Sequence, residues 1–417
     1  MPHVTRVKGF ADLFPPDSAV FAAMEDAARA VFSRFGFEEV RTPLLEFTEL
    51  FTRSIGVETD VVRKEMYSFA DSRGRSLSLR PEATSGVVRA YIDAGLNDGV
   101  GRLFTLGPMF RHERPQLGRM RQFHQINCEC LGTDSPMADV EMILMLLAFL
   151  REIGLSGLKL KINSMGCAEC RPQFRNALSE FLTKVDAGDI CPDCARRAET
   201  NPLRVLDCKV PGCRVLTAEA PVITDMQCPA CKDHFAEARA ILEARSVDFE
   251  LDHRLVRGLD YYCRTTFEVE SVTIGAQSAV AGGGRYDGLV KSLGGPDVPG
   301  VGFACGMERL ALLVQKPSPS VPDFFIVGTD VEAQKAAFNL AQYLRTATLR
   351  GVVSFSTGGM KSLMRQADKS GAKWCLIIGP EELAASAVTV KDMLVGRQIT
   401  VPQNDIFSIL LQPGIRQ

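Results

Sequence analysis

The sequence lacks an apolar run long enough to cross a membrane. The longest such run, Met142–Leu150, falls well short of the roughly 18 residues that a spanning helix needs. The first ten residues, MPHVTRVKGF, also lack the apolar core of a secretory signal. We therefore expect a cytoplasmic protein that does not enter a membrane.

The chain also lacks a charge excess of either sign. It has 48 lysines and arginines against 50 aspartates and glutamates, a net charge of −2. A dedicated nucleic-acid coat protein would be strongly basic. Any contact with RNA must therefore come from local basic patches.

Neither of the two usual phosphate-binding loops is present. The glycines of GGGRYDG (282–288) do not follow the dinucleotide-binding spacing, and STGGMKS (356–362) lacks the Gly-Lys-Ser/Thr sequence of a P-loop. If the protein binds ATP, arginine side chains must hold the phosphates.

The length of 417 residues predicts two or three domains. Strand and hairpin patterns predict an α+β domain made of residues 1–166 and 246–316. Helical spacing and clustered cysteines mark residues 167–245 as an inserted helical domain. A proline-rich linker, QKPSPSVPD (315–323), precedes alternating strands and helices over 322–417, which predict a small α/β domain.

A basic hairpin is the densest functional signal. Leu103–Gly132 reads as strand, polar loop and strand, with arginines at 111, 114, 119 and 121 in the loop. Guanidinium groups bind phosphate oxygens in pairs, which favours a polyphosphate ligand over a merely solvated loop. Phe123 could stack on a base.

Three carboxylates follow strand-like or glycine-containing segments: Glu82, Glu129 and Asp260. Glu82 and Glu129 could converge on one sheet face, where acids opposite arginines would suit a zwitterion. The alternative is that they are ordinary surface acids.

The stretch VRGLDYYCRTTFEVE (256–270) places two tyrosines side by side. Neighbouring residues of a regular strand point to opposite faces, so Tyr261 and Tyr262 cannot both face one ligand there. If both line a pocket, the backbone around them must be irregular.

Thirteen cysteines occur without a secretion signal, so we expect no disulfides. Eight of them form four close pairs within the insertion, at 167/170, 191/194, 208/213 and 228/231. Two such pairs can bind one zinc ion, so the eight thiols could form two sites, or they could be reduced structural cysteines. The spacing alone leaves zinc open, and we assign no metal ligand from the sequence.

Taken together, five ordered motifs resemble the class II aminoacyl-tRNA synthetases, and among them the bacterial histidyl-tRNA synthetases. RTPLLEFTELF (41–51), GPMFRHERPQLGRMRQFHQ (107–125) and GVGFACGMERLALL (300–313) resemble the three class motifs. VRGLDYY (256–262) and AGGGRYDGL (281–289) resemble the two histidine signatures. The resemblance covers essentially the whole chain.

The resemblance implies an antiparallel catalytic domain, an insertion that meets the tRNA acceptor arm, and a C-terminal anticodon-binding domain. It implies a homodimer with Pro43 at the interface. It also implies that L-histidine, ATP with Mg²⁺ and the histidine tRNA are the substrates: histidine is first activated as histidyl-adenylate and then transferred to the tRNA.

The resemblance also implies a role for each matching residue. Arg111 and Arg257 would be catalytic, holding the α-phosphate and the histidine carboxylate. Histidine would further be bound by Glu82, Ala83, Thr84, Gln125, Glu129, Tyr261, Tyr262 and Tyr286, with Glu129 and Tyr262 at the imidazole. ATP would be bound by Arg111, Glu113, Arg119, Arg121, Phe123 and Arg309. Ala83 departs from the glycine usual in the family, and its methyl group is compatible with the site if φ is negative.

Two other functions, a regulatory paralogue and an RNA-binding module, are alternatives to a synthetase. A synthetase-like paralogue could bind histidine as a regulator of its biosynthesis without charging tRNA, but such paralogues generally lack the C-terminal domain and the arginines that are present here. A bare RNA-binding module is disfavoured by the net charge and by the acids of the expected pocket.

Overall fold

A central antiparallel sheet carries the site. The computed structural model describes residues 3–96, 99–273, 279–316, 321–356 and 358–411. The chain divides into two units, residues 1–317 and 318–417. The middle of the expected linker, residues 317–320, lies outside the described residues. Among the described helices, none is long and apolar enough to span a bilayer.

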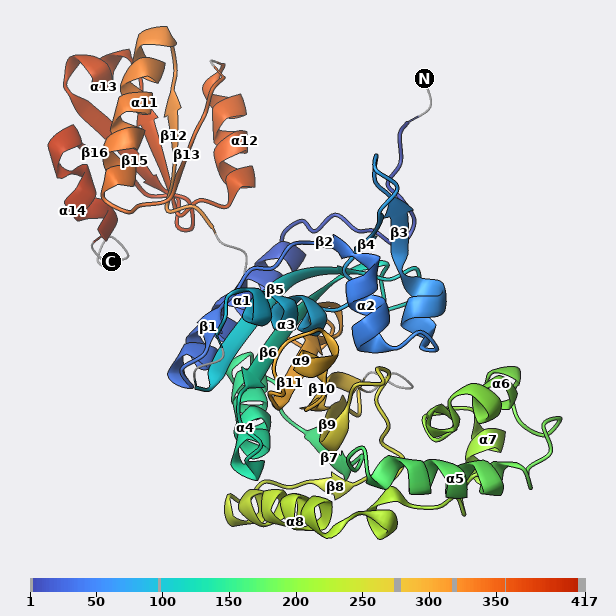
Figure 1. Ribbon diagram of the computed structural model, residues 1–417. Coiled ribbons are helices and arrows are strands. Elements are labelled where there is room, and N and C mark those ends of the chain that lie inside the picture. Colours follow the sequence, from blue (N-terminus) through green and yellow to red (C-terminus); the bar gives the residue numbers. More distant parts are fainter. Residues whose placement is uncertain (1–2, 97–98, 274–278, 317–320, 357, 412–417) are drawn as a thin grey trace. The chain divides into compact units, whose positions relative to one another are not determined.

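The large sheet of the first unit, drawn in Figure 1, has eight strands. Their order is β1 (Glu38–Glu39), β5 (Gly101–Phe110), β6 (Gln122–Leu131), β11 (Gly300–Gly306), β10 (Ala279–Arg285), β9 (Cys263–Ser271), β7 (Leu158–Ser164) and β8 (Glu250–Leu251). The two edge pairs, β1–β5 and β7–β8, are parallel, and the inner strands are antiparallel. The expected 103–132 hairpin is therefore confirmed as β5 and β6.

Helices α1 (Asp17–Arg34) and α4 (Pro136–Glu152) supply the main core over one face of this sheet. The α4 helix starts at Pro136. Ser135 caps it by accepting a hydrogen bond from the amide of Met137, and Pro136 occupies the first turn, where no amide partner is needed.

Smaller elements border the sheet. A three-stranded sheet has the order β2 (Leu45–Phe47), β4 (Ser76–Leu79) and β3 (Tyr67–Ala70), and a turn at Asp71–Arg75 joins β3 to β4. Helices α2 (Thr48–Ile55) and α3 (Thr84–Asp93), the π-helix Val61–Glu65, and the short helices α9 (Leu289–Ser292) and α10 (Met307–Leu310) lie in the same unit.

The expected insertion is helical. It contains α5 (Cys170–Leu182), α6 (Pro192–Thr200), α7 (Pro211–Leu216) and α8 (Pro229–Ala244), with 3₁₀ turns at Pro202–Val205 and Ile223–Met226. A separate apolar cluster forms between Met165 and Ile223, whereas α8 packs its Phe235, Ala238 and Leu242 into the main core beside α4. The α8 helix therefore joins the insertion to the sheet.

The second unit has a five-stranded sheet. Its order is β13 (Gly351–Val353), β12 (Phe324–Gly328), β14 (Trp374–Ile378), β15 (Ala387–Asp392) and β16 (Gln398–Pro402). Strands β12, β13 and β14 are parallel, and the rest are antiparallel. The helices are α11 (Val331–Thr346), α12 (Met360–Ser370), α13 (Pro380–Ala384) and α14 (Ile406–Leu411), with a 3₁₀ turn at Gln403–Asp405. The alternating order expected for an α/β unit is confirmed, with β16 and α14 added.

Candidate active site

A cavity of about 700 Å³ opens on the sheet face opposite α1 and α4. Strand β6 shows why it lies there. Phe123, Gln125, Asn127 and Glu129 line the cavity, whereas the intervening Ile126, Cys128 and Cys130 are buried in the core. Because side chains alternate across a strand, one segment supplies both surfaces.

The glycines of β10 and β11 form the floor of the cavity. A Cβ atom at Gly282 would collide with the guanidinium of Arg257, and one at Gly302 would collide with the carboxylate of Glu129. These glycines are thus needed for close approach of side chains, not to bind phosphate with a loop.

Arg257 lies over this floor. Its Nη1 donates to Glu268 Oε2 at 2.7 Å, and its guanidinium carbon is 5.7 Å from the ring centre of Tyr262. Burial lowers the pKa of Arg257, but Tyr262 and Glu268 outweigh burial and leave the pKa raised. Arg257 is therefore a fixed cation held in a largely enclosed site.

The two adjacent tyrosines both line the cavity. They lie in an irregular segment, since β9 begins only at Cys263, and its register with β10 shifts next to that residue. Their ring centres are 4.7 Å apart, and Tyr261 also meets Tyr286 edge-on at 5.7 Å. The expected irregular backbone is confirmed.

Glu129 is buried at the end of the cavity. Its Oε1 accepts from Thr84 Oγ1 at 2.7 Å, and its Oε2 accepts from the Tyr286 hydroxyl at 2.5 Å. Burial raises the pKa of Glu129 to about 8, although these two hydrogen bonds oppose the shift. The carboxyl group is thus desolvated yet held in position.

The segment Glu82–Ser85 starts helix α3 beside Glu129. Both carboxylate oxygens of Glu82 accept backbone amides, from Thr84 at 2.7 Å and from Ser85 at 2.8 Å. Ala83 is fully buried and has φ −99°, which confirms that a methyl group fits where the family usually has glycine. Ala83 does not itself line the cavity.

Gln125 and Asn127 carry unsatisfied polar atoms. Gln125 Oε1 and Asn127 Nδ2 are buried and have no hydrogen-bond partner among the described residues. A buried polar atom without a partner is costly, so this part of the cavity is suited to a ligand that carries both donors and acceptors.

The other end of the cavity is rich in arginine. Arg111 donates to the carbonyl of Pro81 at 2.8 Å, and its guanidinium carbon lies 5.4 Å from the ring centre of Phe123. Glu113 forms an ion pair with Arg119. Arg309, on α10, donates to the carbonyl of Ala279 at 2.6 Å, and burial lowers its pKa.

Arg121 is the one ATP-binding candidate that does not line the cavity. Its Nε donates to the carbonyl of Glu113 at 3.1 Å, and its aliphatic chain packs over Gly9. The structure therefore does not bring Arg121 together with the other ATP-binding candidates.

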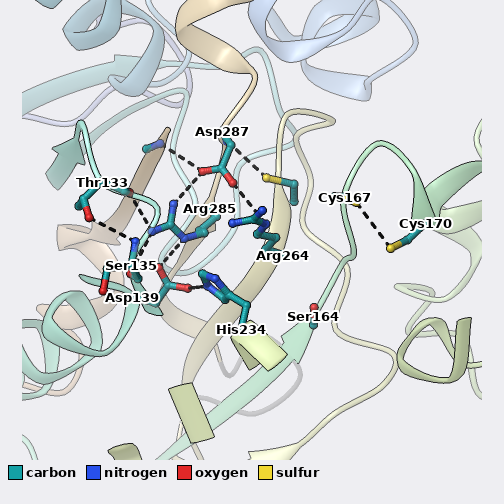
Figure 2. Close-up of polar contacts among 12 residues, drawn as sticks. Thr133, Ser135, Asp139, Ser164, Cys167, Cys170, His234, Arg264, Arg285 and Asp287 are labelled. Carbon is teal, nitrogen blue, oxygen red and sulfur yellow. Dashed lines mark hydrogen bonds and ion pairs between the residues drawn. The ribbon is translucent and has the colours of Figure 1, made fainter. Parts of the chain in front are cut away.

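A buried polar network holds the end of β10 behind the cavity (Figure 2). Arg285 pairs with Asp139 at 2.6 Å and with Asp287 at 2.8 Å, and it donates to the carbonyls of Thr133 and Ser135. His234 of α8 contacts the other oxygen of Asp139 at 2.7 Å. Because Tyr286 follows Arg285 directly, this network also fixes the tyrosine that binds Glu129.

Several cavity residues were not found from the sequence, among them Asn127 and two acids. Glu268 is the partner of Arg257, and Glu65 is a half-buried acid whose pKa is raised by burial and by Glu113. Glu268 could have been found from the alternation of FEVE, which puts its neighbours Phe267 and Val269 in the core. No pattern in the sequence marks Glu65.

Comparison with known proteins agrees with this geometry. A family model described as histidyl-tRNA synthetase matches residues 9–310, and one described as anticodon binding domain matches 323–412. The chain is 60% identical to the histidine–tRNA ligase of Nitratidesulfovibrio vulgaris, covering 99% of this chain and all of that one.

Solved structures agree as well. The apo histidyl-tRNA synthetase of S. aureus matches with a TM-score of 0.81 and 32% identity, over 98% of this chain and all of the other. A Bacillus halodurans structure titled as an ATP phosphoribosyltransferase regulatory subunit/histidyl-tRNA synthetase matches with a TM-score of 0.67, over 91% of this chain and 99% of that one. At 19% identity it shows the shared fold alone.

Proposed function

Because the chain belongs to the histidyl-tRNA synthetase family, we propose that its cavity joins L-histidine to ATP and then passes the histidine to tRNA. In the first step the histidine carboxylate attacks the α-phosphorus, forming histidyl-adenylate and releasing pyrophosphate. In the second step the terminal ribose of the tRNA takes the histidyl group and AMP leaves. The observation that carries this proposal is one cavity with Glu129 and three tyrosines at one end, Arg111 and Arg309 at the other, and Arg257 over the floor beside Tyr262.

The tyrosine end suits histidine. Glu129 would bind an imidazole nitrogen, since it is a buried carboxyl group at the end of the cavity that accepts no backbone amide, and Tyr262 would lie on the other side of the ring. The unsatisfied Gln125 Oε1 would accept from the α-ammonium group together with Thr84 Oγ1. Glu82 would act there as a negative charge, because the amides of α3 already occupy its oxygens.

The arginine end suits a triphosphate. Arg257 and Arg111 would neutralise the α-phosphate and the histidine carboxylate as the new bond forms, and Arg119 and Arg309 would face the leaving pyrophosphate. Catalysis of this kind comes from positioning and charge stabilisation and needs no protein nucleophile. Phe123 would stack on adenine, with Glu113 at its edge.

Synthetases of this class use ATP together with a divalent cation. We propose that Mg²⁺ enters on the phosphate oxygens of ATP with most of its water retained, as Mg²⁺ commonly does. In the described part of the chain, no group of three or more candidate metal donors consists of carboxylates. The cation would reduce the negative charge of the phosphates, and the arginines would orient them.

We propose that residues 322–417 bind the anticodon of the tRNA and that residues 167–245 approach its acceptor arm. The first assignment is supported by the match of 323–412 to an anticodon binding domain. The second is supported by the position of Arg204 and Lys209 at the cavity rim, where basic side chains would meet the phosphates of an incoming RNA end. We propose that these reactions take place in the cytoplasm.

We also propose that the protein is a homodimer that pairs through the surface around Pro43. Leu44, Leu45 and Phe47 are each at least 40% exposed there, and Phe69 of the same small sheet is 49% exposed. Apolar clusters of this kind usually mark an interface. We expect light scattering to give twice the mass of one chain for the wild type and a monomer for Phe47→Glu. A change at an exposed residue of the second unit, Phe355→Glu, should leave the dimer intact.

Amino-acid-dependent exchange of pyrophosphate into ATP tests the proposed function. We expect exchange with histidine and with no other natural amino acid, and we expect the purified enzyme to attach histidine to its tRNA. Histidine binding without exchange would instead favour the regulatory paralogue. That alternative is already weakened by the presence of the second unit and of the three cavity arginines.

A further inference from the structure

The eight cysteines of the insertion gather into two groups of four. The first cysteine cluster is Cys167, Cys170, Cys228 and Cys231, and the second is Cys191, Cys194, Cys208 and Cys213. Within each cluster the four Sγ atoms lie within 4.8 Å of one another. Each cluster thus joins two close pairs that are separated in the sequence.

The distances between sulfur atoms exclude disulfides and fit a single metal ion. Cys167 Sγ lies 3.6 Å from Cys170 Sγ and 3.9 Å from Cys228 Sγ, and Cys191 Sγ lies 3.9 Å from Cys208 Sγ. A disulfide requires about 2.05 Å. Four sulfurs at about 2.3 Å from a zinc ion form a tetrahedron with edges of about 3.8 Å.

The same compactness argues against an iron–sulfur cluster. In such a cluster the cysteines bind different iron atoms, which hold the thiolates further apart than one shared ion does. Four thiolates that surround one point can all bind a single ion there. Zinc prefers such tetrahedral thiolate sites.

Backbone amides donate to one sulfur atom in each cluster. Cys191 and Cys228 are followed by prolines that open α6 and α8, so these cysteines sit at helix N-termini. The amide of Cys191 donates to Cys213 Sγ at 3.2 Å, and the amide of Cys228 donates to Cys170 Sγ at 3.1 Å. Amide donors and the helix dipole both stabilise a negative sulfur.

We propose that each cysteine cluster binds one zinc ion through four thiolates, so that each chain carries two structural zinc ions. Four protein ligands leave no open position for water or substrate, which is the arrangement of a structural site. This inference rests on the sulfur geometry and does not depend on the proposed reaction.

The two zinc sites would fix the insertion against the Val256–Tyr262 segment. Arg171, next to Cys170 of the first cluster, donates to the carbonyls of Asp260 and Tyr262. Near the second cluster, Arg204 donates to the carbonyl of Arg257 at 3.0 Å, and Asn201 donates to Asp260 Oδ1 at 3.0 Å. Zinc in both clusters would therefore hold the backbone that presents Arg257 and the two tyrosines.

Metal analysis of the full-length protein tests the inference. For protein produced with zinc in the medium and purified without chelator, we expect mass spectrometry of the metals to give two zinc ions per chain. The paired changes Cys170→Ser/Cys228→Ser and Cys194→Ser/Cys213→Ser should each leave one. Cys375→Ala, which removes a buried thiol of the other unit, should leave both.

A second measurement covers the case in which the serine variants do not fold. Modifying the wild-type thiols with an organomercurial should release two zinc ions per chain to a coloured zinc indicator. Cobalt supplied in place of zinc should give the visible bands of tetrahedral thiolate cobalt. Absence of metal from the folded wild type, or iron in place of zinc, would overturn the proposal.

Discussion

We expect Arg257→Gln to lower histidine-dependent ATP–pyrophosphate exchange by about 10²–10³-fold, while the dissociation constant for histidine measured without ATP changes little. The reason is that Arg257 lies over the floor of the cavity as a fixed cation, where it would stabilise the charge that develops at the α-phosphate. Removing one preorganised donor of this kind typically costs that much in rate. Calorimetric binding of histidine and the exchange rate together separate the two effects.

The partner of Arg257 supplies the control. Arg257→Gln also leaves the half-buried Glu268 without its cation, and this alone could disturb the site. We therefore expect Glu268→Gln to keep most of the exchange activity, and we expect Arg257→Gln/Glu268→Gln to be as slow as Arg257→Gln. Recovery of activity in the double variant would show instead that the loss came from the unpaired acid.

We expect Glu129→Ala to weaken histidine binding by about 10²-fold or more, because a buried imidazole N–H would lose its acceptor. The KM for histidine should rise, whereas the KM for ATP should not. Tyr286→Phe is the matched control, since it removes a hydroxyl that binds Glu129 and leaves the carboxyl group in place. An equal rise in both KM values for Glu129→Ala would indicate a general disturbance of the cavity.

Glu129 should also make the free energy of unfolding depend on pH when no histidine is bound. Its pKa is raised to about 8 in the folded protein, and unfolding returns it to the ordinary value. Between those values the folded state holds the extra proton, so the free energy of unfolding falls as pH rises, by about 1.4 kcal/mol per unit from this group. We expect Glu129→Gln to lack this slope when the unfolding of the first unit is followed by calorimetry at about pH 6 and about pH 7.5.

Much of the site could be predicted because it is built on regular strands. Alternation along QFHQINCEC puts Phe123, Gln125 and Glu129 on one face, and the neighbouring side chains fill the core. The tyrosine pair instead predicted an irregular backbone. Two adjacent side chains cannot face the same pocket from a regular strand, so Tyr261 and Tyr262 had to lie outside it.

The features that could not be predicted depend on contacts between segments that are distant in the sequence. The approach of Glu268 to Arg257 requires the turn at 256–262, which no local pattern specifies. The first cysteine cluster depends on α5 and α8 beginning side by side, although about sixty residues separate Cys167 from Cys228 in the sequence. Arg121 fits the same basic pattern as Arg119, yet the N-terminal segment at Gly9 holds it away from the cavity.

The glycine floor limits how this enzyme can be redesigned. Any side chain at Gly282 must displace Arg257, and any side chain at Gly302 must displace Glu129, so these positions cannot be used to reshape the pocket for another amino acid. Gly306 differs, because a Cβ atom there meets no atom within 4 Å, although the residue also lines the cavity. Engineering of a new specificity can therefore begin at the end of β11, where the wall of the cavity has spare volume.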